Sequence, residues 1–354
     1  MNTSRIIIML LGGLVIFGLP IWNLARLYGK KHVLWMITPP VLFISIFMMS
    51  SYLDGSQYAN WFMMTRHLAF YWAIITLMMF GFSVLFMLVH YAFRVPKKTT
   101  FWLIIIVTLV YALGARINGE RVVVKDLYLP AENITRSYQF VHITDLHNGS
   151  TDRDHAQKVV DTINQLSAEF VVITGDFIDE YHVTTQDIDP FNELDIPIFL
   201  ITGNHEYYLE EGTVQEVIDG TNILLIDDMK IGFEELDIIG VNEIETVDRT
   251  VAAVGGINPD RYSILLDHQP KTDEVIRASE NGAELMLSGH THKGQIWPMN
   301  YLIQLGFKYV SGLYEIGEMF LYVNPGTGTL GPKMRVGSAN EVTFITLEPT
   351  DTDL

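Results

Sequence analysis

The chain has 354 residues, 23 lysines and arginines, 41 aspartates and glutamates, and a formal net charge of −18 at pH 7. It has no cysteine, which excludes disulfide bonds and thiolate metal sites. The charge is unevenly divided: residues 1–125 hold 11 basic and two acidic residues, whereas residues 126–354 hold 12 basic and 39 acidic residues. A second half with a balance of −27 should repel nucleic-acid backbones, so we expect no nucleic-acid partner.

Four apolar stretches occupy the first third of the chain, and each is a candidate membrane helix. They lie near residues 6–24, 33–53, 68–93 and 99–114. A spanning helix needs about 20 predominantly apolar residues, and the first three stretches are long enough. The fourth is shorter, and Arg116 just beyond it would have to reach back to the interface. We therefore predict a multi-pass integral membrane protein with a four-helix transmembrane region over residues 1–118.

The short loops after the first and third stretches set the expected orientation. Together they hold six lysines and arginines, against five on the opposite side of the four-helix arrangement. Positive residues in short loops favour the cytoplasm. This places both termini, and with them the acidic second half, on the extracytoplasmic side. Residues 119–137 would form a linker, and a separate domain would follow over residues 138–354.

Five apolar runs in the second half end in residues of the kinds that bind metal ions. The runs YQFVHIT, EFVVIT, IPIFLIT, YSILL and AELMLS are typical of short buried strands. They lead into Asp145-Leu146-His147, Gly175-Asp176, Gly203-Asn204-His205-Glu206, Asp267-His268 and Gly289-His290-Thr291-His292. We expect one sheet to present these side chains together at one edge. Ligands of this kind can hold two cations for the hydrolysis of a phosphate ester.

In this order, the five motifs resemble the calcineurin-like metallophosphoesterase family over roughly residues 138–347. The closing segment YVNPGTGTLGPKMRVGSANEVTFITLEP looks like the end of the membrane-anchored branch, transmembrane proteins with a metallophosphoesterase domain. The resemblance implies an α/β domain built as a four-layer α/β/β/α sandwich with two mixed β-sheets. Helical stretches such as 154–166 and 213–219 alternate with the motif strands, as strand–helix units do.

The resemblance also implies a cofactor of two divalent metal ions. One ion would be held by Asp145, His147, Asp176 and His292, and the other by Asp176, Asn204, His268 and His290. Asp176 would bridge the two, using both of its oxygens. Such ions, about 3.5–4 Å apart, clamp a phosphate and lower the pKa of a shared water. Oxygen and imidazole ligands suit manganese, iron or zinc, and the sequence does not choose among them.

His205 directly follows a ligand, and the resemblance implies that it contacts the phosphate and helps to protonate the leaving alkoxide. Two neighbouring residues depart from the family pattern and are candidate substrate contacts. Glu206 stands where the family usually has Asp, and Lys293 replaces the first glycine of a Gly-Gly-Gln sequence. Pro325 stands where the family often has an arginine, so contacts inferred from that arginine cannot be transferred.

Simpler interpretations exist for single residues. An aspartate after a strand is often only a turn or helix-capping residue. For Asp145 or Asp176 alone this role explains the sequence as well as metal binding does, but it explains five such motifs together poorly. His142 lies inside a strand and is expected to be a packed histidine. Asp267 is expected to be structural, because the family ligand at this point is His268.

An apolar, aromatic stretch follows the last metal-binding motif, from Trp297 to Val310. It would either fill the core beneath a loop or stay exposed, where it would accept acyl chains or enter the membrane interface. On the second interpretation Trp297, Leu302 and Phe307 are substrate contacts. The function predicted is a membrane-anchored phosphoesterase that hydrolyses a phosphodiester or pyrophosphate of a lipid or lipid-linked substrate. The alternatives are a catalytically weak membrane sensor or scaffold that binds a phosphorylated ligand, and a phosphodiesterase of soluble nucleotides.

Overall fold

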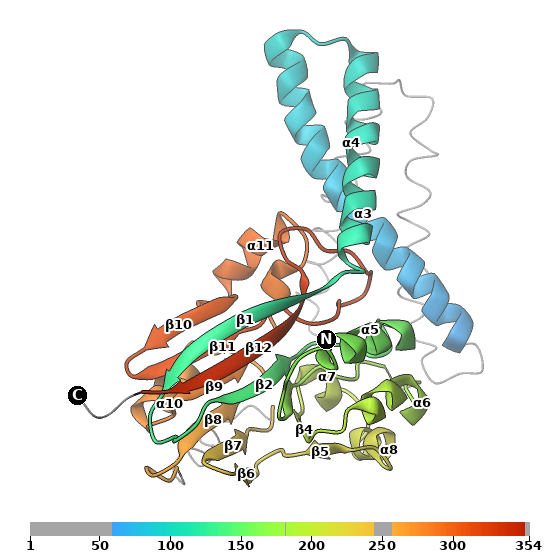
Figure 1. Ribbon diagram of the computed structural model, residues 1–354. Helices are drawn as coiled ribbons and strands as arrows, with labels where there is room; N and C mark the ends of the chain where they lie inside the picture. The colour runs from blue at the N-terminus through green and yellow to red at the C-terminus, as the bar shows by residue number, and fades with distance from the viewer. Residues whose placement is uncertain (1–58, 181, 244–256, 351–354) are drawn as a thin grey trace, which may run out of the picture. The chain divides into compact units, whose positions relative to one another are not determined.

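A computed structural model of the protein describes residues 59–180, 182–243 and 257–350 (Figure 1). The chain divides into two compact units, Met1–Gly114 and Ala115–Leu354. The first two expected membrane helices, near residues 6–24 and 33–53, lie outside the described residues.

Two long apolar helices are described in the first part of the chain. Helix α3 spans Ala59–Phe93 and helix α4 spans Lys97–Asn118. The segment Ile74–Phe93 and the whole of α4 are long and apolar enough to cross a membrane. Helix α4 is longer than the apolar stretch predicted at 99–114, because helical hydrogen bonding continues through polar residues at both of its ends.

Within the first unit, the two helices pack through apolar side chains. Phe101 and Ile104 of α4 are buried among Met79, Phe86 and Met87 of α3. Two apolar helices thus lie where the sequence predicted the third and fourth stretches, and the structure adds that they pack against each other.

The second unit contains two six-stranded sheets. The first has the order β1-β12-β2-β3-β4-β5 and the second the order β10-β11-β9-β8-β7-β6. Strands β2, β3, β4 and β5 are mutually parallel, whereas β12 runs antiparallel to β2. In the second sheet β7, β8, β9 and β11 are parallel, and both edge strands are antiparallel to their neighbours. The predicted pair of mixed sheets is confirmed.

The bounds of the strands follow the apolar runs of the sequence. In the first sheet they are β1 Val122–Ala131, β2 Tyr138–Ile143, β3 Val171–Thr174, β4 Ile198–Ile201, β5 Ile223–Leu225 and β12 Asn340–Pro349. In the second they are β6 Lys230–Phe233, β7 Leu236–Gly240, β8 Tyr262–Leu266, β9 Leu285–Ser288, β10 Gly312–Ile316 and β11 Met319–Val323. Strands β3, β4, β7, β8 and β9 are buried along their whole length, which explains their mostly apolar sequences; Asp237 in β7 is an exception and pairs with Arg261.

Helices and helical turns complete the second unit. They are α5 Arg153–Ile163, α6 Thr185–Ile188, η2 Asp189–Glu193, α7 Asn204–Tyr207, α8 Thr213–Ile218, α10 Thr272–Glu280, η3 His292–Gly294, α11 Met299–Leu302 and η4 Ile303–Leu305. The apolar face of α5 packs with one face of the first sheet, and that of α10 packs with one face of the second. A third cluster joins Phe140 and Val172 of the first sheet to Ile264 and Leu287 of the second, so the two sheets pack face to face.

The expectation of a linker over residues 119–137 is wrong. Strand β1 lies within it and pairs in parallel with β12, from Val122 opposite Asn340 to Ala131 opposite Pro349. The domain therefore begins before the first metal-binding motif. A boundary drawn at that motif misses an edge strand whose partner lies more than 200 residues further along the chain.

Candidate metal centre

The predicted ligands lie in the loops that follow five strands. Asp145 follows β2, Asp176 follows β3 and Asn204 follows β4. His268 follows β8, and the histidines at 290 and 292 follow β9. The expectation of a single sheet is therefore wrong, because β2, β3 and β4 belong to the first sheet and β8 and β9 to the second. The carboxyl ends of parallel strands in two facing sheets meet at one site, a position where α/β proteins commonly bind ligands.

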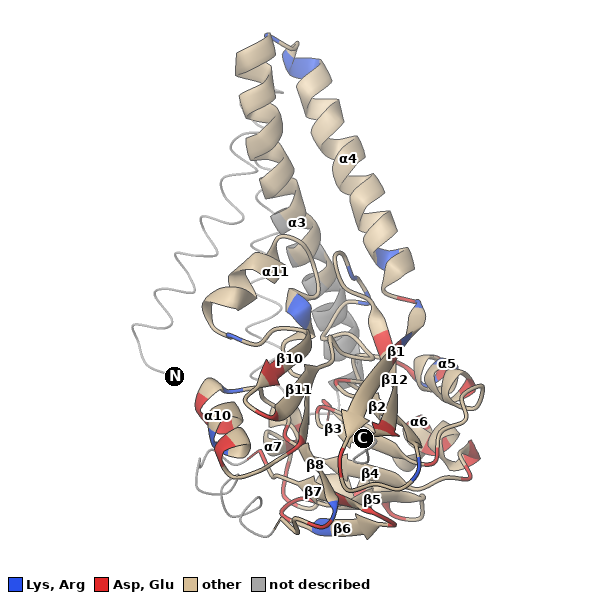
Figure 2. Cartoon of the chain, turned by 60° about the vertical axis from the view of Figure 1, so that its left-hand side comes forward, with Lys and Arg blue, Asp and Glu red and all other residues tan. Residues whose placement is uncertain are grey.

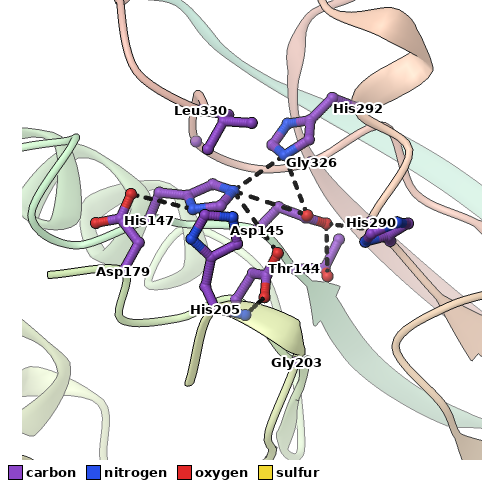
Figure 3. A network of polar contacts seen from close by, with 12 residues as sticks. Thr144, Asp145, His147, Asp179, Gly203, His205, His290, His292, Gly326 and Leu330 are labelled. Carbon is purple, nitrogen blue, oxygen red and sulfur yellow. Dashed lines mark hydrogen bonds and ion pairs between the residues drawn. The ribbon is translucent and has the colours of Figure 1, made fainter. Parts of the chain in front are cut away.

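The first cluster joins Asp145, His147 and His292 (Figure 3). The two Nε2 atoms of the histidines lie 3.0 Å apart. Nε2 of His292 is 3.2 Å from Oδ1 of Asp145, and Nε2 of His147 is 3.9 Å from the same oxygen. That buried oxygen has no hydrogen-bond partner. A buried carboxylate oxygen facing two imidazole nitrogens fits a cation, since a buried charge is stable only when it is paired.

The second cluster joins Asp176, His268 and His290. Oδ2 of Asp176 is 3.2 Å from Nε2 of His268, which is itself 3.2 Å from Nδ1 of His290. Asn204 also belongs here, because its Oδ1 lies 3.2 Å from Nε2 of His268. The structure thus brings together the residues that the sequence assigned to the second ion.

Asp176 connects the two clusters through one oxygen. Oδ2 lies 4.0 Å from Nε2 of His147 and 3.2 Å from Nε2 of His268. Oδ1 instead accepts a hydrogen bond from the backbone N–H of His205 at 2.8 Å. One oxygen of Asp176 thus faces both clusters and the other accepts a backbone hydrogen bond, and the bridge between two ions stays a prediction. The neighbouring backbone N–H group, which the sequence cannot place, fixes the orientation of the carboxylate.

Ionisation in the two clusters is set by close opposite charges. Burial opposes the charged form of Asp145, but the neighbouring His292 holds the pKa of this carboxyl well below its usual range. Burial alone would lower the pKa of His147, yet Asp179, Asp176 and Asp145 together raise it to about 9. The pKa of His290 falls to about 3 because it is buried and lies next to His268. The site is therefore built to hold carboxylates charged beside positive charge, which metal ions would supply.

Backbone conformation also marks the site. Most of the ligands occupy the left-handed region that residues other than glycine rarely adopt: Asp145 (φ 51°), His147 (54°), Asp176 (50°), His290 (68°) and His292 (48°). Each such residue costs on the order of 1–3 kcal/mol and persists only where the surroundings enforce it. Concentrated strain of this kind is typical of a functional site.

Two glycines of the motifs allow the loops to approach one another. A Cβ on Gly175 would lie 2.7 Å from Cα of Gly203 and 2.8 Å from Nδ1 of His268. A Cβ on Gly203 would collide with the carboxylate of Asp176. The Gly-Asp and Gly-Asn-His sequences are therefore interlocked, and neither glycine can be replaced without moving a ligand.

Asp179 is a residue of the site that the sequence analysis missed. Its Oδ2 lies 3.2 Å from Nδ1 of His147, and its Oδ1 accepts the backbone N–H of Ser150 at 3.0 Å. A carboxylate behind a histidine fixes the ring so that the opposite nitrogen faces the metal. Thr174 serves His268 in the same way, since its carbonyl accepts Nδ1–H at 2.8 Å. The available signal was an aspartate three residues after Asp176.

His205 lies beside the first cluster and is half-buried, as are the ligands Asn204 and His290. Its ring meets that of His147 edge to face, with 4.8 Å between centroids (Figure 3). Burial and the charge of His147 lower the pKa of His205. A ring nitrogen of His205 also lies within ligand distance of Asp179 and His147, so its role as a proton donor rather than a ligand stays a prediction.

Glu206 does not lie where a substrate contact would. Its side chain is buried and accepts hydrogen bonds from the backbone N–H groups of Asp176 (2.9 Å), Gly203 (2.8 Å) and Ile178 (2.8 Å). Burial and the charge of Asp176 raise the pKa of Glu206 to about 7. The residue therefore joins the loops after β3 and β4, and the extra methylene relative to Asp lets it reach three donors.

The remaining candidate contacts lie around the site. Lys293 is exposed, as are Trp297 and Leu302, whereas Phe307 is half-buried. The Phe307 ring packs on that of His290, with 5.2 Å between centroids. Helices α11 and η4 contain no buried residue, while Tyr309 is buried. The stretch is exposed or half-buried from Trp297 to Lys308, and only its C-terminal end, Tyr309 and Val310, is core. A contact of the exposed part with acyl chains stays a prediction. His142 and Asp267 are buried as expected.

Two mixed sheets with paired aspartate–histidine clusters at their strand ends define a metal-dependent hydrolase. Residues 138–294 match the calcineurin-like phosphoesterase family. The chain is 33% identical over 270 residues to a metallophosphoesterase of Campylobacter jejuni, covering 71% of this chain and 70% of that protein. The chain belongs to the calcineurin-like phosphoesterase family, whose members are metal-dependent phosphoester hydrolases.

Relatives in vertebrates are named transmembrane proteins with a metallophosphoesterase domain. That of Bos taurus is 33% identical over 236 residues, which cover 60% of this chain and 53% of the relative. That of Danio rerio is 30% identical over 274 residues, which cover 70% of this chain and 62% of the relative. The matched region thus spans between half and about two thirds of these proteins. Together with the two apolar helices, these relatives indicate association with a membrane.

Proposed function

We propose that the protein hydrolyses a phosphodiester or pyrophosphate of a lipid or lipid-linked substrate at a membrane surface. The observation that carries the hydrolytic part is the convergence of two aspartate–histidine clusters joined through Oδ2 of Asp176. The first cluster together with Asp176 would hold one divalent ion, and the second cluster together with Asn204 would hold the other. Each ion would be manganese, iron or zinc. When bound, two such ions orient a phosphate and lower the pKa of a water molecule.

His205 would act on the leaving group. The backbone N–H of His205 donates to Oδ1 of Asp176. Because this bond involves the backbone and not the ring, the ring can move while Asp176 stays in place. A partly exposed imidazole next to the ligand cluster is placed to give a proton to an alkoxide as the ester bond breaks. Substrates whose leaving group needs no proton should therefore depend less on this residue.

The exposed apolar residues near the site support a lipid substrate. Leu302 is 53% and Leu305 84% exposed, and Phe307 links this stretch to His290. Leu330, whose backbone is bonded to the side chain of Gln295, is also 46% exposed. Exposed apolar side chains near a metal site favour acyl chains over a hydrated nucleotide.

The charge distribution supports the same class of substrate. No acidic residue occurs between Glu284 and Glu315, although residues 126–354 hold 39 acids, and the interval contains Lys293 and Lys308. Figure 2 shows acidic positions on α5 and α10 and none on α11. An anionic headgroup would approach the site along this uncharged to weakly basic side with little repulsion.

We also propose that residues 1–118 form a multi-pass membrane region with the catalytic unit on the extracytoplasmic side. Helices α3 and α4 supply two candidate spans, and the loop charges supply the orientation. Protease added to intact cells or spheroplasts should then digest the acidic unit. Digestion only after the membrane is permeabilised would reverse the orientation.

The enzymatic proposal is tested with the full-length protein in detergent, loaded with Mn²⁺. It should hydrolyse bis(p-nitrophenyl) phosphate, and Asp176→Asn should not. A protein that binds phosphorylated ligands but turns over no ester with any of the three metals would instead be a sensor or scaffold. Among natural substrates, lipid extracts from cells that lack or overproduce the protein, compared by mass spectrometry, should differ in a phosphorylated lipid. A difference confined to soluble nucleotides would contradict the lipid proposal.

A further inference from the structure

Arg335 has the largest side chain among the fully buried residues that the structure describes. It lies in the segment between β11 and β12, behind the first metal cluster. Among the described residues, no carboxylate accepts a hydrogen bond from it. A buried guanidinium without a directly bonded carboxylate is costly, so its position requires another explanation.

Each of the five N–H groups of Arg335 has an acceptor. The Nε atom donates to Oδ1 of Asn340 at 2.5 Å, and Nη1 donates to Oγ of Ser338 at 3.0 Å. The other three acceptors are backbone carbonyls, those of His292 (3.5 Å), Gly326 (3.1 Å) and Gly328 (2.5 Å). Only the planar fork of arginine offers five donors in fixed directions; lysine offers three.

These carbonyls belong to two segments that meet at the first cluster. Gly326 is close-packed there: a Cβ on it would lie 2.8 Å from Nη2 of Arg335 and 3.0 Å from Nδ1 of His292. The next residues are bonded to the first motif, since the N–H of Gly328 donates to the carbonyl of Asp145 at 3.0 Å. The guanidinium therefore fastens the backbone of His292 to the segment that packs on Asp145.

The backbone of His292 needs such a support, because its φ of 48° is unfavourable for a residue with a side chain. Relaxation of that φ would turn the ring away from Oδ1 of Asp145, which now lies 3.2 Å from Nε2. The main chain of Arg335 is itself held on both sides. Its N–H donates to the carbonyl of Ala115 at 2.9 Å, and its carbonyl accepts Nδ2 of Asn118 at 3.1 Å. Both partners belong to the last turn of α4, within the same unit.

We propose that Arg335 is a positioning residue of the metal centre: it holds His292 in its strained conformation so that Nε2 of this histidine faces Asp145. It acts on the first ion only, because its acceptors include no residue of the second cluster. The inference rests on the proposed metal centre, and it adds a residue that none of the metal-binding motifs contains.

The test is Mn²⁺ binding to the full-length protein in detergent, measured by equilibrium dialysis for wild type and Arg335→Lys. Outer partners of metal ligands typically contribute about 10–100-fold in affinity, so one of the two ions should bind about 10–100-fold more weakly while the other is unchanged. Arg153→Lys is the matched control, because Arg153 is exposed and, among the described residues, forms an ion pair with half-buried Asp189. It should bind both ions as the wild type does.

His292→Ala separates this inference from the proposed function. It should lose the same single ion, and the double variant with Arg335→Lys should lose no more, since both changes act through one ligand. Two ions bound by Arg335→Lys with wild-type affinity would overturn the role of Arg335 and leave the metal centre intact. Equal weakening of both ions would overturn it as well. Absence of Mn²⁺ binding in the wild type would contradict the proposed centre itself.

Arg335→Lys could misfold, which circular dichroism of the metal-free protein would reveal. A second, milder variant keeps the proposal testable in that case. Ser338→Ala removes one acceptor from Nη1 and leaves the arginine in place. It should weaken the same single ion by a smaller factor. A folded Ser338→Ala protein with unchanged affinity for both ions, beside an unfolded Arg335→Lys, would show that the arginine serves folding alone.

Discussion

The site has a floor, formed by the metal-binding residues in the loops after β2, β3, β4, β8 and β9, and a rim, formed by α11 and η4. The two are built in opposite ways. On the floor, the ligands are mostly buried, several have strained backbone angles, and outer partners such as Asp179 and the Thr174 carbonyl fix their rings. On the rim, α11 and η4 present exposed apolar side chains, and neither contains a buried residue. This difference indicates that the floor determines the reaction and the rim determines which substrate reaches it. Changes on the floor should therefore abolish turnover of every ester, and changes on the rim should alter preference.

The largest effect is expected from Asp176→Asn. Its Oδ2 faces both clusters, so loss of the charge should weaken both ions and reduce turnover by more than the roughly 10²–10⁴-fold that one acid–base group contributes. Elemental analysis would give the metal content per chain, and an assay with an aryl diester would give the rate. Asp145→Asn is the comparison, and it should empty mainly one site. An Asp176→Asn protein that binds two ions and turns over the ester at the full rate would contradict the assignment of Asp176 to both ions.

The next effect is expected from His205→Ala. If this residue gives a proton to the leaving group, both ions and the fold should be retained while the rate for an alkyl ester falls about 10²–10⁴-fold. The loss should be smaller for an aryl ester, whose leaving group needs no proton. Equal losses for the two esters would argue against a proton donor, and loss of an ion would show that His205 is a ligand.

Asp179→Asn should have an intermediate effect. The variant keeps a group of the same size behind His147 but removes the charge that orients the ring, so metal affinity at the first cluster should fall about 10–100-fold. Isothermal titration with Mn²⁺ would measure it. Asp189→Asn, at a half-buried position where the side chain pairs with Arg153, should leave the metal affinity unchanged. An unchanged affinity in Asp179→Asn would remove this carboxylate from the metal centre.

The smallest and most selective effect is expected on the rim. Leu302→Ser together with Phe307→Ser should raise KM for a micellar lipid substrate and leave kcat/KM for a small soluble ester unchanged, because neither side chain holds a metal. Leu224→Ser is a matched control, since Leu224 is 46% exposed on an edge strand, compared with 53% for Leu302. If kcat/KM falls equally for both substrates, Phe307 acts through His290 and the rim has no role in selecting lipid.

The two mixed sheets were predicted from the resemblance to a known family. The residues of the floor could be recognised in the sequence itself, because short apolar runs that end in glycine, aspartate and histidine are local signals. It did not reveal that the loops come from two sheets, since the sheet to which a strand belongs depends on pairings such as that of β9 with β11. It also placed strand β1 in a linker. That strand is defined by pairing with β12 at the far end of the chain, which no local pattern records.

The outer partners of the ligands were missed for a related reason. Asp179, Arg335 and the backbone donors that hold Glu206 act through contacts between segments that meet only after folding, and no local pattern records them. Glu206 was assigned to the substrate because it departs from the family pattern, but its longer side chain reaches inward. Exposure of the 297–305 stretch could not be read from composition, because core and rim here use the same aromatic and aliphatic residues.

The most direct test of the dinuclear floor is a metal titration of the full-length protein after removal of its ions by a chelator. Turnover of bis(p-nitrophenyl) phosphate is measured as Mn²⁺, iron or Zn²⁺ is added in steps. We predict no turnover without metal and a rate that rises until two ions are bound per chain, with Asp176→Asn inactive throughout. Full turnover in the metal-free protein, or a maximum reached with a single ion, would contradict the dinuclear metal centre.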